Sequence, residues 1–397
     1  MVRAHPRGFR GLLRDRSGVQ RVTYIELFYD LVYVFAVTQL SHNLLAHPTL
    51  RGALESAVLL AMVWQVWAYT TWVTNWTDPE RIEIRLLLVV LMLVSLAMSS
   101  ALPRAFGDLG WVVGGAYAVQ QIGRSLFMAV TLRGPLRRNF QRILAWCVVS
   151  GSLAVAGGLT HGWPRGVLWL LAVGVDVTGA IAGFYTPGLG KSRTSDWDIA
   201  GEHFAERCQG FILIGLGESI VIIGATLSAA GHPSGTETAA FVVAFVGALA
   251  LWWLYFDRSA DAGADVMATS EDPGRLGRSA YTLIHPIMVA GIIVTAAGDE
   301  KILAEPSHIA TTASAWMILG GPALFLAGHA AFKAVVWRVV PWPRMSGIAV
   351  LALLALAAKA IPEIALAATA AVVVAAVAAV EQVLLRSRND AVTSPGH

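Results

Sequence analysis

Long apolar segments, separated by short polar loops, follow one another along most of this chain. A helix needs about 20 mostly apolar residues to cross the roughly 30 Å hydrocarbon core of a membrane. Only Ala360–Glu363 separates the last two segments, so these form either two spans or one broken helix. We predict about twelve transmembrane helices, near residues 24–46, 53–76, 84–103, 111–132, 142–160, 166–187, 203–229, 238–257, 279–298, 309–332, 345–360 and 362–385.

The composition indicates an all-α integral membrane protein, with the lipid bilayer as its first partner. The 397 residues are 56% hydrophobic and 14% charged, with a mean hydropathy of +0.62. Soluble domains contain about 25% charged residues. The net charge of +3 follows from the loops and gives no reason to expect nucleic-acid binding.

Lysine and arginine residues alternate between the loops in a way that predicts the orientation. The tails and every second loop carry 22 of them, and the intervening loops carry only Arg51, Arg104, Arg165 and Lys301. Because cytoplasmic loops are enriched in these residues, both termini are expected in the cytoplasm. This predicts a multi-pass protein of the cytoplasmic membrane with an even number of spans.

The sequence gives no sign of a cofactor or a resident metal. Cys147 and Cys208 both lie inside predicted spans, which argues against a disulfide framework and against a zinc site. No phosphate-binding loop, dinucleotide fingerprint or zinc-protease motif occurs. The pair His203 and Glu206 lacks the repeated Glu-x-x-His pattern of di-iron bundles.

The two halves of the chain resemble one another, which predicts a parallel repeat of six plus six helices. The segment Asp78–Arg81 follows span 2 and Asp272–Arg275 follows span 8, while Gly123–Phe127 in span 4 corresponds to Gly328–Phe332 in span 10. Chance similarity between apolar segments is the alternative. The expected organisation is an Arg-rich cytoplasmic tail, a first half, a cytoplasmic linker, a second half and a cytoplasmic tail, at 1–23, 24–187, 188–202, 203–385 and 386–397.

Two carboxylates mark the first span as a candidate site. Glu26 and Asp30 are one helical turn apart and share a face with Tyr33. Charged side chains inside a membrane normally face protein or water and are functional by default. The pair is suited to proton relay, cation binding or acid–base catalysis. The alternative is a helix cap with a salt bridge to a neighbouring helix.

Span 7 carries the second set of charges. His203, Glu206 and Arg207 lie near its start, and Glu218 lies three turns further on. A purely structural Glu218 would need a partner such as Arg124 or His329, so we favour a functional role for it. Asp176, Asp257 and His285 are further buried candidates, of which His285 is expected to be a hydrogen-bonded core residue.

These motifs resemble the bacterial low-temperature-requirement protein A family. The similarity lies in Glu26–Ala36, in His203–Arg207 leading to Leu216–Ile220, and in Gly320–Leu324, and it extends over nearly the whole chain. The resemblance implies a polytopic inner-membrane protein, with Glu26, Asp30, His203, Glu206, Arg207 and Glu218 as motif positions. Arg124 is a departure, because a less basic residue is expected there.

Two functions agree with this pattern, and they belong to different classes. The first is a transporter-like permease for a small lipophilic molecule, in which these motif residues, with Tyr33, Arg124 and His329, bind or relay protons. The second is a membrane-embedded enzyme, for example a cyclase acting on a prenylated substrate, with Glu26, Asp30, Glu206 and Glu218 as general acids or bases. A scaffold whose charges only join helices is a third possibility. The sequence does not fix the oligomeric state.

Overall fold

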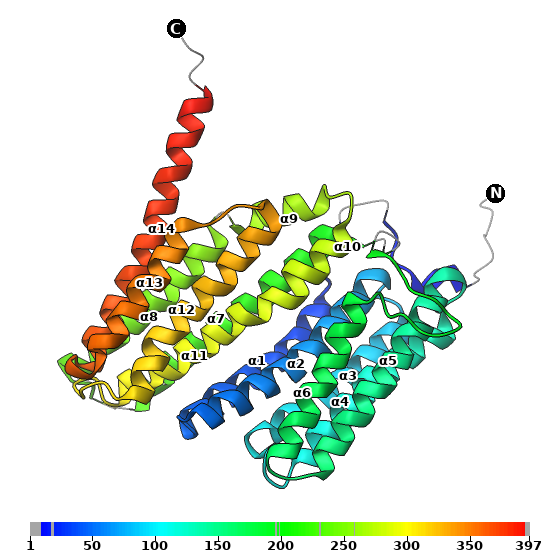
Figure 1. Ribbon diagram of the computed structural model, residues 1–397, viewed down its shortest axis with the longest axis horizontal. Helices are drawn as coiled ribbons and strands as arrows, with labels where there is room; N and C mark the ends of the chain where they lie inside the picture. The colour runs from blue at the N-terminus through cyan, green and yellow to red at the C-terminus, as the bar shows by residue number, and fades with distance from the viewer. Residues whose placement is uncertain are drawn as a thin grey trace. The chain divides into compact units, whose positions relative to one another are not determined.

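The computed structural model describes residues 9–16, 20–194, 197, 199–229, 232–257 and 259–393, which are almost entirely helical (Figure 1). The predicted tails at 1–23 and 386–397 therefore fall partly outside the described residues. The long helices are α1 Tyr24–Ala46, α2 Leu50–Trp76, α3 Ile82–Ala101, α4 Gly110–Thr131, α5 Gly134–Leu159, α6 Trp163–Ile181, α7 Gly201–Ala229, α8 Gly235–Phe256, α11 His285–Ala304, α12 Thr312–Trp337, α13 Trp342–Ala357 and α14 Glu363–Thr393. Shorter elements are η1 Phe9–Leu12, η2 Leu102–Arg104, α9 Ser259–Ala268, α10 Pro273–Leu276, the π-helix η4 Gly277–Ile284 and η5 Ala358–Ala360.

Ten helical segments within the described residues are long and apolar enough to cross a membrane. Helices α1 and α4 are long but are not among them. Helix α1 carries Glu26, Asp30 and His42, and α4 carries Gln121 and Arg124, which lowers their apolar character. The membrane-spanning, all-helical fold is confirmed, and the number twelve stays a prediction.

The last two predicted spans are separate helices. Helix α13 continues through η5, and the chain then breaks at Ile361 and Pro362 before α14 begins. Ile361 has an extended backbone, and Pro362 lacks the N–H that a continuous helix requires. Both segments are long and apolar enough to span a membrane.

The chain packs as two compact units. The first comprises residues up to 43, 50–210 and 264–283, and it contains α1 to α6 with the start of α7. The second comprises 44–49, 211–263 and residues from 284 onward, and it contains α8, α11 to α14 and the rest of α7. The halves predicted at 24–187 and 203–385 were based on an internal sequence repeat and not on packing. They stay a prediction.

Glycines allow the closest helix contacts in each unit. In the first unit, a Cβ atom at Gly158 of α5 would lie 2.6 Å from the carbonyl oxygen of Gly110 in α4. In the second, a Cβ atom at Gly291 of α11 would lie 2.5 Å from the backbone nitrogen of Phe325 in α12. Membrane helices have little hydrophobic drive to associate, so such close backbone packing contributes much of their stability.

The π-helix η4 is held by two tryptophans of α2. Trp64 Nε1 donates to the carbonyl oxygen of Thr282 at 2.7 Å, and Trp72 Nε1 donates to Thr282 Oγ1 at 3.1 Å. Short π segments often lie at functional sites, because the wider turn exposes backbone groups to side-chain partners. Both indoles are buried, so these hydrogen bonds fix η4 against α2 inside the first unit.

Candidate functional site

The start of α1 carries two buried acidic residues of the candidate site. Glu26 and Asp30 are 0% and 3% exposed, although they lie only one helical turn apart. Tyr33 continues the same buried face, as predicted. Burying two carboxylates so close together is costly unless each is paired with a cation and hydrogen-bonded.

Arg207 of α7 joins the two carboxylates. Its Nε and Nη2 atoms donate to Asp30 Oδ2 and Oδ1 at 2.8 and 2.6 Å, which is the two-pronged geometry that guanidinium groups make with carboxylates. Its Nη1 atom donates to Glu26 Oε1 and to Thr74 Oγ1, both at 3.1 Å. Trp67 Nε1 also donates to Asp30 Oδ1, at 2.7 Å.

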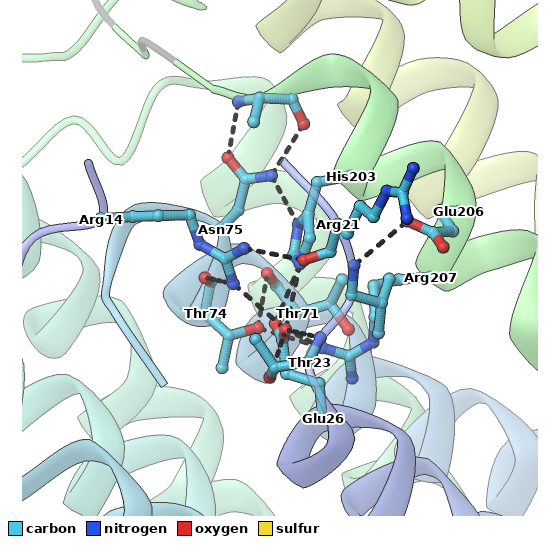
Figure 2. A network of polar contacts seen from close by, with 12 residues as sticks. Arg14, Arg21, Thr23, Glu26, Thr71, Thr74, Asn75, His203, Glu206 and Arg207 are labelled. Atoms are coloured by element: carbon cyan, nitrogen blue, oxygen red, sulfur yellow. Dashed lines mark hydrogen bonds and ion pairs between the residues drawn. The ribbon is translucent and has the colours of Figure 1, made fainter. Parts of the chain in front are cut away.

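Arg14 supplies a second cation from the segment that precedes α1. Its Nη2 atom lies 3.1 Å from Glu26 Oε2 and 3.1 Å from the carbonyl oxygen of Thr74 (Figure 2). Two guanidinium groups therefore face the two carboxylates, and the charges of the cluster balance. Thr23 adds hydrogen bonds to Glu26 Oε2 from its backbone nitrogen and its hydroxyl group.

The surroundings of His203 determine which of its nitrogens carries the proton. The side chain of Asn75 accepts from the backbone nitrogen of Ala200 and donates to its carbonyl oxygen, both at 2.9 Å, which fixes its Nδ2 atom as the donor. Nδ2 lies 3.1 Å from His203 Nδ1, so Nδ1 accepts. His203 Nε2 then donates to Glu26, 3.0 Å away at Oε1, and the ring is the neutral tautomer.

A second buried polar network lies deeper in the first unit. Asp176 of α6 accepts hydrogen bonds from Tyr117 and Gln121 of α4, and Arg124 donates to Gln121. Arg124 also donates to Thr70 Oγ1 at 3.1 Å. Arg124 is thus hydrogen-bonded to neutral groups of α2 and α4. From the sequence, it was instead considered as a partner for Glu218.

The second unit contains its own set of buried charges. His329 Nδ1 lies 3.3 Å from Arg344 Nη2, and Glu381 accepts from both Arg344 and Lys333. His285 Nε2 lies 2.9 Å from the hydroxyl group of Tyr255, so it is the hydrogen-bonded core histidine that was expected.

Buried carboxylates of the second unit, among them Glu218, Asp299 and Glu363, have an oxygen with no hydrogen-bond partner among the described residues. Glu218 is 2% exposed, and its Oε1 atom has no hydrogen-bond partner among the described residues. Asp299 of α11 is 6% exposed, and its Oδ2 atom likewise has none. Asp299 lines a cavity of about 20 Å³ together with Ile318 and Pro322 of α12. Because Pro322 has no N–H, the carbonyl group of Ile318 lacks its usual helical partner.

An aromatic cavity of about 40 Å³ lies in the first unit. Its wall includes Trp72, Trp76 and Trp197, with Arg124 and Arg278 as the charged groups among the described lining residues. Trp197 packs edge-to-face on both other tryptophans, with ring centroids 5.3 and 6.3 Å apart. At this size the cavity holds about one water molecule, so a larger ligand requires side chains to move.

Comparison with known proteins agrees with these motifs. The model of the family described as Bacterial low temperature requirement A protein (LtrA) matches residues 21–379. The chain belongs to this family. An uncharacterized protein of Rhizobium meliloti (strain 1021) is 36% identical over 343 residues, which cover 86% of this chain and 84% of the relative. No solved structure matches the chain.

The motif residues that carry the resemblance to the low temperature requirement A family have very different surroundings. Glu26, Asp30, His203 and Arg207 meet in one cluster. Glu206 does not belong inside it, because its side chain is exposed and accepts from the backbone nitrogen of Val22 at 3.2 Å. No group of three or more potential ligands for a metal ion occurs within the described residues.

Three residues that contribute to the buried polar clusters of this low temperature requirement A protein were not predicted from its sequence. Arg14 was assigned to a tail, and its packing against α2 has no sequence motif. Trp67 lies in the span predicted at 53–76, and no local pattern indicates its partner. Asp299 follows directly after the predicted end of span 9 at residue 298, and a longer span would have included it.

Proposed function

We propose that this protein is a proton-coupled permease for a small lipophilic molecule. The observation that carries the proposal is the contrast between the first two turns of α7 and its middle. His203 and Arg207 belong to a fully paired cluster, whereas Glu218, eleven residues beyond Arg207, is buried with an unsatisfied oxygen. Intramembrane carboxylates of the second kind are typical of proton relays in transporters.

The two sets of acids are proposed to have different roles. Every carboxylate oxygen of Glu26 and Asp30 already accepts at least one hydrogen bond from a cation or an N–H group. This cluster is suited to holding α1, α2 and the start of α7 together. Glu218 and Asp299, each buried with one unpartnered oxygen, are the carboxylates that we propose for the proton relay.

The pairing of helices supports a duplicated, transporter-like architecture. The first six long helices make the contacts α2–α4, α2–α6, α3–α4, α4–α5 and α5–α6. The last six make the corresponding contacts α8–α12, α8–α14, α11–α12, α12–α13 and α13–α14, and they also make α8–α11, α11–α14 and α12–α14 contacts, which the first six do not match to the same extent. Such equivalence is expected of a parallel six-helix repeat, in which both copies have the same orientation in the membrane.

The enzyme hypothesis remains the alternative, and the aromatic cavity is the observation that favours it. Tryptophan faces stabilise cationic groups, as a cyclisation of a prenylated substrate would require. The described residues that line this cavity include no aspartate, glutamate or histidine, so the proposed acids and bases lie elsewhere. Permease activity therefore explains more of the buried carboxylates.

Proteoliposomes with an imposed pH gradient test the permease. Purified protein is reconstituted with a pH-sensitive dye inside, and a fluorescent lipophilic cation, a neutral analogue and an anion are added in turn. We expect at least one probe to accelerate collapse of the gradient, and Glu218→Gln to reduce that rate at least about tenfold, because the amide cannot exchange a proton. Product analysis with prenylated substrates tests the alternative.

Glu202→Gln is the matched control, since it makes the same chemical change on an exposed residue of the same helix. Its flux should equal that of the wild type. Equal flux in Glu218→Gln and Glu202→Gln, or a wild type indistinguishable from empty liposomes with every probe, would contradict the proposal.

A further inference from the structure

A wide basic cleft opens at one end of the first unit. Its volume is about 1240 Å³, and it lies where the segment before α1, the end of α2, the start of α5 and the loop after α6 come together. Figure 1 shows the segment before α1 and the start of α5 at the same end of this unit. Cavities that bind small ligands usually measure about 300–1,000 Å³, so this cleft has room for a sizeable ligand.

Cationic side chains dominate the lining of the cleft. Asp15 is the acidic residue among the described lining residues. The cations are Arg14, Arg16, Arg133, Arg138, Arg142 and Lys191. Positive charge on this side of the molecule agrees with the predicted orientation. Orientation alone does not require that cations from three separate segments border a single cavity.

The cleft combines fixed and exposed cations. Arg142 donates through Nε to the carbonyl oxygen of Leu189 at 2.9 Å and through Nη1 to Asn139 Oδ1 at 2.8 Å, which holds its guanidinium group in place. Arg138 and Lys191 are exposed and come from different elements. One anchored guanidinium group together with exposed cations suits an anion that enters from water.

The start of α5 adds a second source of positive potential. Gly134, Pro135 and Leu136 line the cleft, and they form the first turn of this 26-residue helix. The N–H groups of a first helical turn lack intrahelical acceptors, and the helix dipole places partial positive charge there. Phosphate groups commonly bind at such helix starts when side-chain cations are also present.

We infer that this cleft binds a phosphate-bearing anion. Arginine matches the geometry of phosphate oxygens with paired donors, and five of the six cations are arginines. Leu13, Trp76 and Leu136 provide an apolar wall beside them, which suits a phosphate attached to an apolar group. A phospholipid headgroup and a soluble phosphate compound share this recognition chemistry.

Arg14 connects the cleft with the buried cluster. Arg14 is one of the lining residues, and its guanidinium group donates to Glu26 Oε2 and to the carbonyl oxygen of Thr74. The cleft and the buried cluster therefore share one residue. The inference concerns a site separate from the proposed transport carboxylates, and it stands whether or not the protein transports protons.

Calorimetric titration of the detergent-solubilised full chain tests the inference. The probes are dihexanoyl phosphatidylglycerol, dihexanoyl phosphatidylcholine and inorganic pyrophosphate, at about 0.15 M salt where exposed charges are screened beyond about 8 Å. We expect an anionic probe to bind at least about tenfold more tightly than phosphatidylcholine. The double variant Arg138→Gln/Lys191→Gln should weaken this binding at least about tenfold, because two charge-assisted contacts are lost.

Arg81→Gln/Arg85→Gln is the matched control, because it removes two exposed arginines on the same predicted side, outside the cleft. Its affinity should stay within about twofold of the wild type. Phosphatidylglycerol binding alone identifies a lipid headgroup, pyrophosphate binding alone identifies a soluble phosphate, and mutual competition identifies a site for both. Arg133→Gln provides an independent second variant, and unchanged thermal unfolding confirms that each variant is folded.

Absence of binding by both anionic probes overturns the inference. Equal weakening in the cleft variants and in the control pair overturns it as well, since the attraction would then be general surface charge.

Discussion

At the residue scale, the cluster around Arg207 shows how two acids can be buried side by side. The guanidinium group contacts both carboxylates, and Arg14 balances the second negative charge. Replacing such an ion pair by apolar groups is often tolerated, but removing one partner leaves an uncompensated charge. Replacing one charged residue of the cluster should therefore lower the stability of the protein more than replacing both partners of an ion pair together.

Arg207→Leu should destabilise the protein strongly. It leaves Asp30 with the indole N–H of Trp67 as its remaining hydrogen-bond donor among the described residues, and the expected loss is about 3–5 kcal/mol. Thermal unfolding in detergent, followed by tryptophan fluorescence, measures the effect. Adding Asp30→Leu should recover part of the loss.

Arg85→Leu, at an exposed position, serves as the reference substitution. Equal unfolding temperatures for Arg207→Leu and Arg85→Leu would refute the view that this cluster holds the first unit together.

At the element scale, helix pairs approach most closely where glycines face a neighbouring backbone. A Cβ atom at Gly114 of α4 would overlap the carbonyl oxygen of Ala154 in α5, whereas a Cβ atom at Gly115 would have no atom within 4 Å. Neighbouring glycines in one helix thus have opposite packing roles. Helix propensity is the same for both, so only contact distinguishes them.

Gly114→Leu should separate α4 from α5 and destabilise the first unit by about 1–3 kcal/mol or more, because the backbone has to shift. Gly115→Leu should leave the unfolding midpoint nearly unchanged or raise it slightly. Comparing the two midpoints in the same detergent measures the difference. A Gly115→Leu variant that is as unstable as Gly114→Leu would contradict this packing.

Helix boundaries were predictable, and the partners of the polar residues were not. The apolar run predicted at 24–46 is helix α1, which ends at Ala46 because Pro48 disfavours a helical backbone at His47. The pairing of Glu26 with Arg207 joins residues 181 positions apart, and no local pattern encodes it. The neutral tautomer of His203 depends on Asn75 and Ala200, which only the folded chain brings together.

At the scale of the whole molecule, the orientation in the membrane follows from loop charges and remains a prediction. The segment from Arg81 to Arg104 contains α3, which is long and apolar enough to span. Both arginines have exposed side chains, at 54% and 62%. A label attached at each position therefore shows on which side of the membrane that end of α3 lies. The native cysteines, Cys147 and Cys208, are both buried.

Cysteine labelling of intact cells tests the orientation. A membrane-impermeant maleimide should label Arg104→Cys from outside and should label Arg81→Cys only after the membrane is opened. The wild type should stay unlabelled, because its two thiols are buried. Labelling of Arg81→Cys alone would invert the orientation, and labelling of both from outside would show that α3 does not cross.

The segment before α1 has a practical consequence for anyone who shortens this chain. Arg14 N donates to the carbonyl oxygen of Trp76 at 3.0 Å, and Asp78 N donates to the carbonyl oxygen of Leu12 at 2.9 Å. These two backbone hydrogen bonds attach residues 12–14 to the end of α2. A truncation that starts just before α1, as hydropathy alone would recommend, also deletes the guanidinium group that neutralises Glu26. Such a deletion is equivalent to a point mutation in the buried cluster, and affinity tags are best placed at the C-terminus.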